Sequence, residues 1–307
     1  MLTRFLNKSK PVNYLLTVVF LALIFVAHFL LSGVWNYTAF EILKHFFIII
    51  LLLFSLLLAD FITRKNDLTR KNTFVIFFYA TYCTLFPESF FKSDVLISHF
   101  FILLALRRII SFKSRKDLQK KIFDAALWIS IASCFDFWAF SFIFVLYLNI
   151  LFEAGSNYRH YFIPFLGFFT VLILTNVLTL YFQNAFYLPI DWAGSAGFDF
   201  TAYNNAVILI PLTLVLTLLV WMIGIYFLRI KLMSKKRIRS MRLILVILAV
   251  ALFVPVVTAH KSGAELIYMA LPFAIITTNF IELPEEKYFK ELLLWLFLLL
   301  PFLLFFL

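Results

Sequence analysis

The sequence is short of charge, glycine and cysteine. Only 14% of its 307 residues are charged, whereas a water-soluble domain needs far more polar surface to cover its core. Its 7 glycines provide few of the small-residue contacts through which membrane helices approach closely. Its 2 cysteines, Cys83 and Cys134, fall in or beside apolar runs. They predict buried, inert thiols and neither a disulfide framework nor a metal cluster.

Apolar residues make up most of the chain. Hydrophobic residues make up 64% of the chain and aromatic ones 20%, with 42 phenylalanines, so we expect bulky side chains to interlock between helices. A helix of about 20 apolar residues crosses a bilayer, and this rule predicts about 11 spans. They lie near residues 14–32, 45–61, 73–87, 95–110, 122–135, 138–153, 161–183, 205–229, 242–259, 264–281 and 291–307.

The spacing of these runs predicts an all-α fold, a polytopic transmembrane helical bundle. No connection between the runs is long enough to hold a soluble domain, so residues 1–307 are expected to form a single transmembrane domain. The first run, residues 14–31, is long enough to span, and no convincing small-residue cleavage site accompanies it. We therefore expect it to be retained as the first helix.

The basic residues predict the orientation of the bundle. The net charge is +11, but Lys and Arg lie in short connections between apolar runs, which does not indicate a nucleic-acid-binding face. With the N-terminus in the cytoplasm, all but three of the 27 basic residues fall on the cytoplasmic side. The exceptions are Lys44, Lys92 and Lys261. The positive-inside rule therefore predicts a cytoplasmic N-terminus and, for an odd number of spans, a C-terminus outside.

The most informative stretch is AHKSGAELIYMALPFAIITTNFIE, residues 259–282. It places His260, Lys261 and Glu265 together at the outer end of one predicted span. Ionisable groups are costly in a bilayer, so their clustering indicates a site. A polar cap at the interface between two spans is the alternative interpretation.

The same stretch resembles the late transmembrane segment of GT-C glycosyltransferases, in which a His-Lys pair precedes an aromatic residue, apolar residues and proline. The matching residues are His260, Lys261, Tyr268 and Pro272; the basic residue that often stands before the aromatic one is absent. The resemblance implies sugar transfer from polyprenyl-phosphate carriers on the outer side of the membrane. It also implies an acidic residue in the first outer loop as base, which would be Glu41.

Two further segments, FLNKSKPVNYLL and LRRIISFKSRKDLQKKIFDAALWISIASCFDFW, resemble a group of uncharacterised polytopic inner-membrane proteins from Bacteroidota. This resemblance extends over most of the chain. It implies a multi-pass protein of the bacterial inner membrane, and it brings no activity with it.

Carboxylates next to tryptophans form two other candidate sites on the outer side. Asp136 stands at the apex of a very short predicted connection, and Trp138 could stack against a sugar or a lipid head. Asp191 and Trp192 repeat the combination in the longest outer connection. Such pairs suit a base that deprotonates an acceptor hydroxyl. A turn aspartate with an interfacial tryptophan is the alternative interpretation.

A basic stretch on the cytoplasmic side predicts an anchor for anionic lipid headgroups. Docking of a phosphate-bearing lipid from the inner leaflet is the sharper alternative. The residues concerned are Arg107, Arg108, Lys113, Arg115 and Lys116. The histidines of the apolar runs share no metal-binding spacing, so we expect no metal site, and no cofactor is indicated.

Three hypotheses for function follow. The first is a GT-C-like protein of envelope biogenesis that handles a polyprenyl-phosphate-linked sugar, with Glu41 or Asp136 as base. His260 and Lys261 would then neutralise the carrier phosphate, and Glu265 would orient them. The second is a non-catalytic membrane subunit that scaffolds an envelope machine and binds a membrane-protein partner. The third is a transporter or flippase, although no internal repeat or matched pair of broken spans is found.

Overall fold

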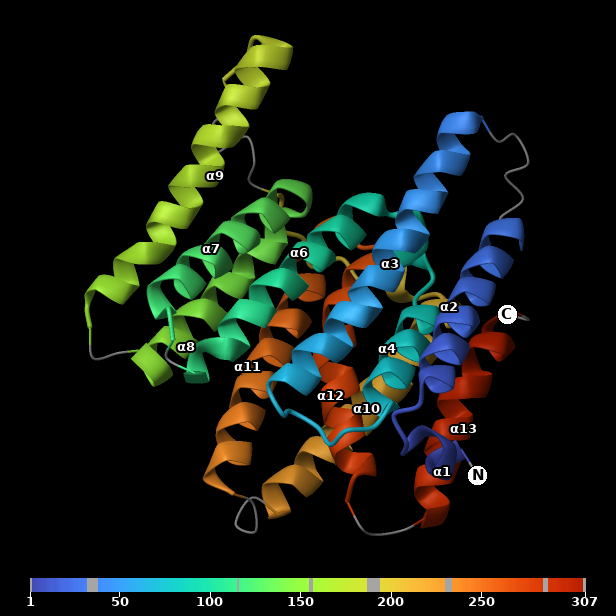
Figure 1. The fold of residues 1–307 in the computed structure, drawn as a ribbon. Coiled ribbons are helices and arrows are strands. Elements are labelled where there is room, and N and C mark those ends of the chain that lie inside the picture. The colour runs from blue at the N-terminus through green and yellow to red at the C-terminus, as the bar shows by residue number, and fades with distance from the viewer. Residues whose placement is uncertain are drawn as a thin grey trace.

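The computed structural model describes residues 2–31, 38–114, 116–154, 157–186, 194–229, 234–283 and 287–305 (Figure 1). Across these residues the secondary structure is helical, apart from one isolated bridge between Ala196 and Thr258. The predicted all-α class is therefore confirmed for the described part of the chain.

The helices follow the apolar runs and break at polar connections. The α-helices are α1 (Leu2–Leu6), α2 (Pro11–Leu31), α3 (Ala39–Lys65), α4 (Phe74–Leu85), α5 (Glu88–Phe91), α6 (Ser93–Ile110), α7 (Leu118–Phe135), α8 (Ile143–Ala154), α9 (Arg159–Gln183), α10 (Ala206–Arg229), α11 (Lys235–Val257), α12 (Ala270–Ile281) and α13 (Lys287–Leu304). Short 3-10 helices join several of them: η1 (Ser111–Ser114), η2 (Phe137–Phe142), η3 (Thr201–Tyr203) and η5 (Ala264–Met269).

Seven helices in the described ranges are long and apolar enough to cross a membrane. They are Pro11–Leu31, Ala39–Lys65, Ser93–Ser114, Arg159–Gln183, Ala206–Leu228, Arg237–Val257 and Ala264–Ile281. The remaining predicted spans coincide with helices that are shorter, α4 and η2–α8, or that carry more charge, α7 and α13. The chain is thus a membrane protein with transmembrane helices, and the count of about 11 spans stays a prediction.

The core surrounds α4 and α12. Every residue of α4 is buried, and so is 94% of the span formed by η5 and α12. Phe78 of α4 packs edge-on against Phe273 of α12 and Phe297 of α13, with ring centroids 6.5 and 5.7 Å apart. Such edge-to-face pairs are favourable because the ring edge is positive and the ring face negative. Phenylalanine packing is therefore a main source of contact between these helices.

One glycine allows a close helix contact. At Gly167 of α9, an added Cβ would lie 2.8 Å from Ala126 Cβ of α7, so the two backbones approach as only glycine permits. Beyond this contact α9 extends away from the other helices (Figure 1). Its outer side chains, among them Phe165 and Ile173, are exposed. In a bilayer these apolar side chains face lipid.

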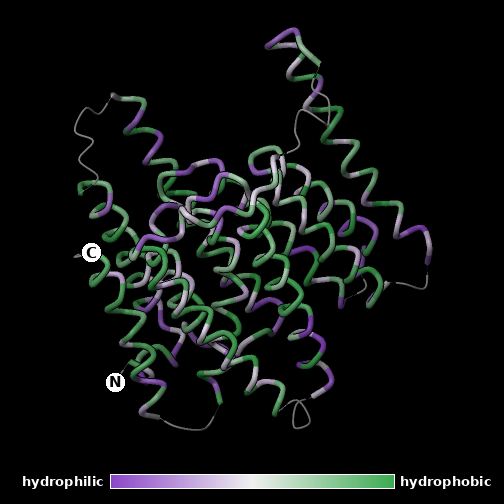
Figure 2. Tube along the Cα trace, turned by 180° about the vertical axis from the view of Figure 1, so that it is seen from behind, coloured by the Kyte–Doolittle hydropathy of each residue, from purple (hydrophilic) through white to green (hydrophobic). Residues whose placement is uncertain are grey.

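Most connections rich in Lys and Arg meet at one end of the bundle. The backbone N–H of Thr73 donates to the Leu6 carbonyl at 3.0 Å, and Arg239 pairs with Glu153 at 3.3 Å. We call this end, formed by residues 64–72, 107–114, 116–121 and 235–242 with Glu282, the basic end. Residues 136–138, 194–203 and 258–265 form the opposite end. Figure 2 shows hydrophobic residues along most helices and hydrophilic ones mainly near their ends.

Candidate functional site

Asp136 lies at the opposite end, where α7 stops and η2 begins. Its Oδ1 accepts from the Trp138 N–H at 3.3 Å, and its Oδ2 lies 2.8 Å from the Tyr268 hydroxyl. That hydroxyl is also 2.7 Å from Ser98 Oγ. Burial raises the pKa of the Asp136 carboxyl, the charge of Glu265 adds to the rise, and the bonds from Tyr268 and Trp138 oppose it. A carboxyl tuned in this way suits proton transfer.

Lys261 holds the outer segment in place. Its ammonium donates to the carbonyl oxygens of Gly197 at 2.7 Å, Val256 at 3.0 Å and Thr258 at 2.5 Å. An ammonium has three N–H donors, so this cage uses all of them. The side chain is buried and its nitrogen lies 4.7 Å from the centre of the Phe200 ring. Lys261 therefore clamps residues 197–200 onto the end of α11.

Glu265 is also enclosed by the protein. One carboxylate oxygen accepts from the Tyr203 hydroxyl at 2.6 Å and from the Ser262 N–H at 3.0 Å. The other accepts from Ser262 Oγ at 3.1 Å. Burial, followed by the neighbouring Glu265 charge, raises the pKa of the Tyr203 phenol. The pair thus fixes η3 against η5.

The structure brings most of the predicted outer residues to one place. Trp138 donates from Nε1 to the Ser195 carbonyl at 3.3 Å, which joins η2 to the segment that Lys261 clamps. His260 is exposed beside this cluster. All three N–H donors of Lys261 are bonded to carbonyl oxygens of the protein. Of the two residues predicted to bind a phosphate, His260 is therefore the one that a ligand can reach.

The contacts that the structure describes for Glu41 do not include any residue of the cluster around Asp136, Lys261 and Glu265. It lies in the first turn of α3, where its N–H donates to Thr38 Oγ1 at 3.3 Å and its carbonyl lies 2.8 Å from His45 Nδ1. A carboxylate in this position is favoured by the helix dipole. Asp191 and Trp192 lie outside the described residues, as does Arg115 of the basic stretch.

At the basic end, the predicted headgroup residues line a cavity of about 370 Å³. Arg107 and Arg108 reach it from α6, and Lys113 and Lys116 from the η1–α7 connection. We call it the basic cavity. The prediction that these residues act together is consistent with their shared cavity, and their binding of lipid stays a prediction.

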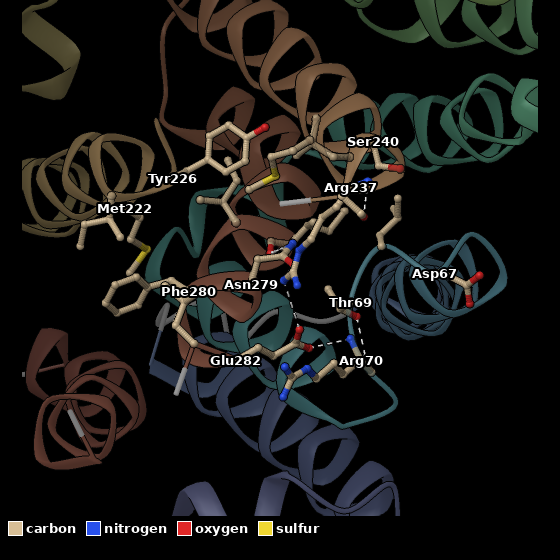
Figure 3. A pocket seen from close by; sticks show the side chains of 18 residues that line it. Asp67, Thr69, Arg70, Met222, Tyr226, Arg237, Ser240, Asn279, Phe280 and Glu282 are labelled. Carbon is tan, nitrogen blue, oxygen red and sulfur yellow. Dashed lines mark hydrogen bonds and ion pairs between the residues drawn. The ribbon is translucent and has the colours of Figure 1, made fainter. Parts of the chain in front are cut away.

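A second hollow at this end was not indicated by the sequence. It has a volume of about 240 Å³ and lies between α10, α11, α12 and the α3–α4 connection (Figure 3). We call it the amphipathic pocket because one part is apolar and another polar. Its apolar part includes Met222, Ile225, Met241, Ile244, Ile275 and Phe280.

The polar part of the amphipathic pocket centres on Arg237. Its Nη2 donates to Asn279 Oδ1 at 2.8 Å and lies 3.7 Å from Glu282 Oε2 (Figure 3). The other oxygen of Glu282 accepts from the Arg70 N–H and from Asn72 Nδ2, both at 2.7 Å. The Glu282 side chain is 3% exposed and that of Arg237 38%. Glu282 thus joins α12 to the α3–α4 connection, and Arg237 reaches the pocket surface.

Tyr226 adds an unpaired hydroxyl to the same pocket. Its oxygen is buried and has no hydrogen-bond partner among the described residues. A buried hydroxyl without a partner is costly unless a ligand or water satisfies it. Sequence analysis missed this pocket because its residues come from four separate segments, and no spacing within any one of them reveals the others.

Comparison with known proteins gives a family. The chain belongs to DUF6427, a family of unknown function, whose model matches residues 1–307. No curated protein and no solved structure matches the chain. The expected membership of an uncharacterised family is therefore confirmed, whereas a setting in Bacteroidota and the likeness to GT-C enzymes stay predictions.

Proposed function

We propose that this protein handles a lipid with a phosphate-bearing head in the bacterial inner membrane, as part of envelope biogenesis, and binds that head in the amphipathic pocket. The observation that carries the proposal is the unpaired Tyr226 hydroxyl beside Arg237 in a pocket with apolar walls. Arginine and phenol are donors for phosphate oxygens, and hydrogen bonds from a charged donor are the stronger kind. Apolar walls suit the hydrocarbon that follows the head.

The size of the pocket supports a head with a short length of tail. Pockets that enclose a whole small ligand have volumes of about 300–1,000 Å³. The amphipathic pocket, at about 240 Å³, is smaller. Its walls belong to α10, α11 and α12, and α10, α11 and the segment formed by η5 and α12 are each long and apolar enough to span the membrane. We therefore expect most of the tail to lie in the bilayer beside these helices.

The charges in the pocket permit an anion to bind. Glu282 would repel a phosphate, but one of its carboxylate oxygens accepts from the Arg70 N–H and from Asn72, and the other, which has no hydrogen bond to a described residue, lies 3.7 Å from the Arg237 guanidinium. The bonds of the Arg237 guanidinium to described residues use Nη2. Its Nε and Nη1 groups are left as donors, because a guanidinium carries five N–H bonds in a planar fork.

The experiment compares lipid retention by the unchanged protein and an Arg237→Gln variant, extracted in mild detergent and weighed by native mass spectrometry. We expect the unchanged protein to retain a phosphate-bearing lipid. Arg237→Gln should retain ~10-fold less, as loss of one charge-assisted hydrogen bond implies.

The matched control is Arg239→Gln. Arg239 lies on the same helix, is 62% exposed and pairs with Glu153 outside the amphipathic pocket. Because both variants lose one positive charge, a general effect of charge would reduce retention equally. Equal retention by the two variants would refute the proposal.

Sugar transfer at the opposite end is a second candidate function. It is favoured by the half-buried Asp136 carboxyl, whose pKa is raised and which accepts a hydrogen bond from the backbone N–H of Trp138. In this hypothesis either Asp136 or Glu41 is the base that deprotonates the acceptor hydroxyl. Membranes containing Asp136→Asn should then lose transfer from a polyprenyl-phosphate-sugar donor at normal protein level. Full activity after both Asp136→Asn and Glu41→Gln would exclude it.

A further inference from the structure

The basic cavity has an excess of positive charge. Its described lining includes two carboxylates, Asp67 and Asp117. The cations of its lining outnumber them and are Lys65, Arg107, Arg108, Lys113, Lys116 and Lys121. They come from the end of α3, the end of α6, the η1–α7 connection and the start of α7. Segments distant in sequence thus bring like charges to one hollow.

At least two of these cations have partners within the protein. Arg108 pairs with Asp124 at 2.8 Å. Lys121 donates to the Ser111 carbonyl at 2.9 Å and to Ser114 Oγ at 2.5 Å, which fixes η1 against α7. Burial, followed by the charges of Arg108 and other neighbouring cations, lowers the pKa of Lys121. Repulsion from the neighbouring cations therefore disfavours the charged form of Lys121, although this side chain holds η1 against α7.

The cavity lies at the ends of two helices, α3 and α6, that are long and apolar enough to span a membrane. Lys65 and Arg107 lie over the ring of Phe61, at 5.2 and 5.0 Å from its centre. Phe61 is exposed and belongs to α3, which is long and apolar enough to span. Long basic side chains at the end of a span reach from the apolar region towards the headgroups. The cations are thus placed where phosphate groups of lipids and solutes both have access.

We infer that the basic cavity binds a ligand with two or more phosphate groups, at a site separate from the amphipathic pocket. Each phosphate neutralises part of the excess charge, and clustered Lys and Arg bind such anions through charge-assisted hydrogen bonds. The ligand is either the headgroup of a lipid with two phosphates or a soluble pyrophosphate. The inference does not depend on the proposed function, because the two hollows use different cations.

The experiment uses a triple variant, Lys65→Gln, Arg107→Gln and Lys116→Gln, which spares Arg108 and Lys121. The control is Arg4→Gln, Lys8→Gln and Lys10→Gln, which removes the same charge from exposed residues outside the cavity. Both are compared with the unchanged protein in two arms. One arm titrates pyrophosphate against protein in neutral phosphatidylcholine nanodiscs. The other counts cardiolipin molecules retained from mixed nanodiscs by native mass spectrometry.

We expect the cavity variant to bind ~100-fold more weakly in at least one arm, because three cations are removed, and the control to bind nearly as the unchanged protein does. An effect on pyrophosphate identifies a soluble ligand, and one on cardiolipin alone identifies a lipid head. Equal loss in both variants, or no binding in either arm, overturns the inference.

A second measurement, on the unchanged protein, tests the inference even if the cavity variant does not fold. In the unchanged protein, a bound polyphosphate should slow chemical acetylation of Lys65 and Lys116 and leave Lys8 and Lys10 unaffected. Uniform acetylation rates with and without ligand would overturn the inference independently.

Discussion

The two ends of the bundle use their cations differently. At the opposite end, Lys261 donates all its N–H groups to the carbonyls of Gly197, Val256 and Thr258. At the basic end, Arg237 binds described residues through Nη2 and reaches the surface of a pocket. A saturated cation stabilises the fold, whereas one with donors left over is suited to an outside anion. We infer that Lys261 serves to make the opposite end rigid and that Arg237 serves to bind a ligand at the basic end.

Two tyrosines show the same contrast. The Tyr268 hydroxyl lies within hydrogen-bonding distance of both Ser98 and Asp136, in the interior. The Tyr226 hydroxyl is buried without a partner in the described residues. Because an unpaired buried hydroxyl costs folding free energy, its presence in a pocket indicates a requirement other than stability. Substitutions at Lys261, Tyr268, Tyr226 and Asp136 test whether the two ends differ in this way.

The largest effect is expected for Lys261→Met. The substitution leaves three carbonyl oxygens without their donor and removes the clamp on residues 197–200, so the free energy of unfolding should fall by about 3 kcal/mol. Denaturant unfolding in detergent measures it, and proteolysis should become faster in the 194–203 segment. Lys92→Met, at an exposed residue, is the control. An unchanged unfolding free energy would show that the cage contributes nothing and would remove the contrast with Arg237.

A pair of identical truncations tests the contrast between the tyrosines. Tyr268→Phe should lower the free energy of unfolding by about 1–2 kcal/mol, because it removes a hydroxyl bonded to both Ser98 and Asp136. Tyr226→Phe should leave it unchanged or raise it slightly, since no bond to a described residue is lost. Tyr226→Phe should nevertheless reduce lipid retention in native mass spectrometry. Equal destabilisation by both truncations would contradict the proposed difference.

The sequence predicted the helical segments well because their boundaries depend on local composition. The run at 161–183 became α9, which begins at Arg159 and ends at Gln183, where polar residues resume. It also placed Asp136 at a short connection, and the structure has it between α7 and η2. Number and direction of membrane crossings depend on the bilayer, which the chain alone does not specify.

The sites were predictable only in part, since hydrogen-bond partners depend on how the helices assemble. The grouping of Lys261 with Glu265 followed from their closeness in sequence. That Lys261 is caged by Gly197 could not be inferred, because the partner is a backbone carbonyl far along the chain. The amphipathic pocket depends on Arg237 meeting Asn279 and Glu282, a contact between neighbouring helices that periodicity within each helix cannot reveal.

The smallest expected effect is a pH dependence from Asp136. Its carboxyl has an ordinary pKa of 3.8, and burial raises the pKa in the folded protein. The folded state therefore binds the proton more tightly than the unfolded state. The stability that this binding contributes is complete below pH 3.8 and is lost as the pH rises through the folded pKa. Asp136→Asn cannot ionise, so the unfolding free energy of the unchanged protein should fall relative to that of the variant when the pH is raised from about 4 to about 7. Paired denaturation curves at both pH values measure this difference. A constant difference would mean that water reaches the carboxyl freely and that the opposite end is less closed than the Lys261 cage implies.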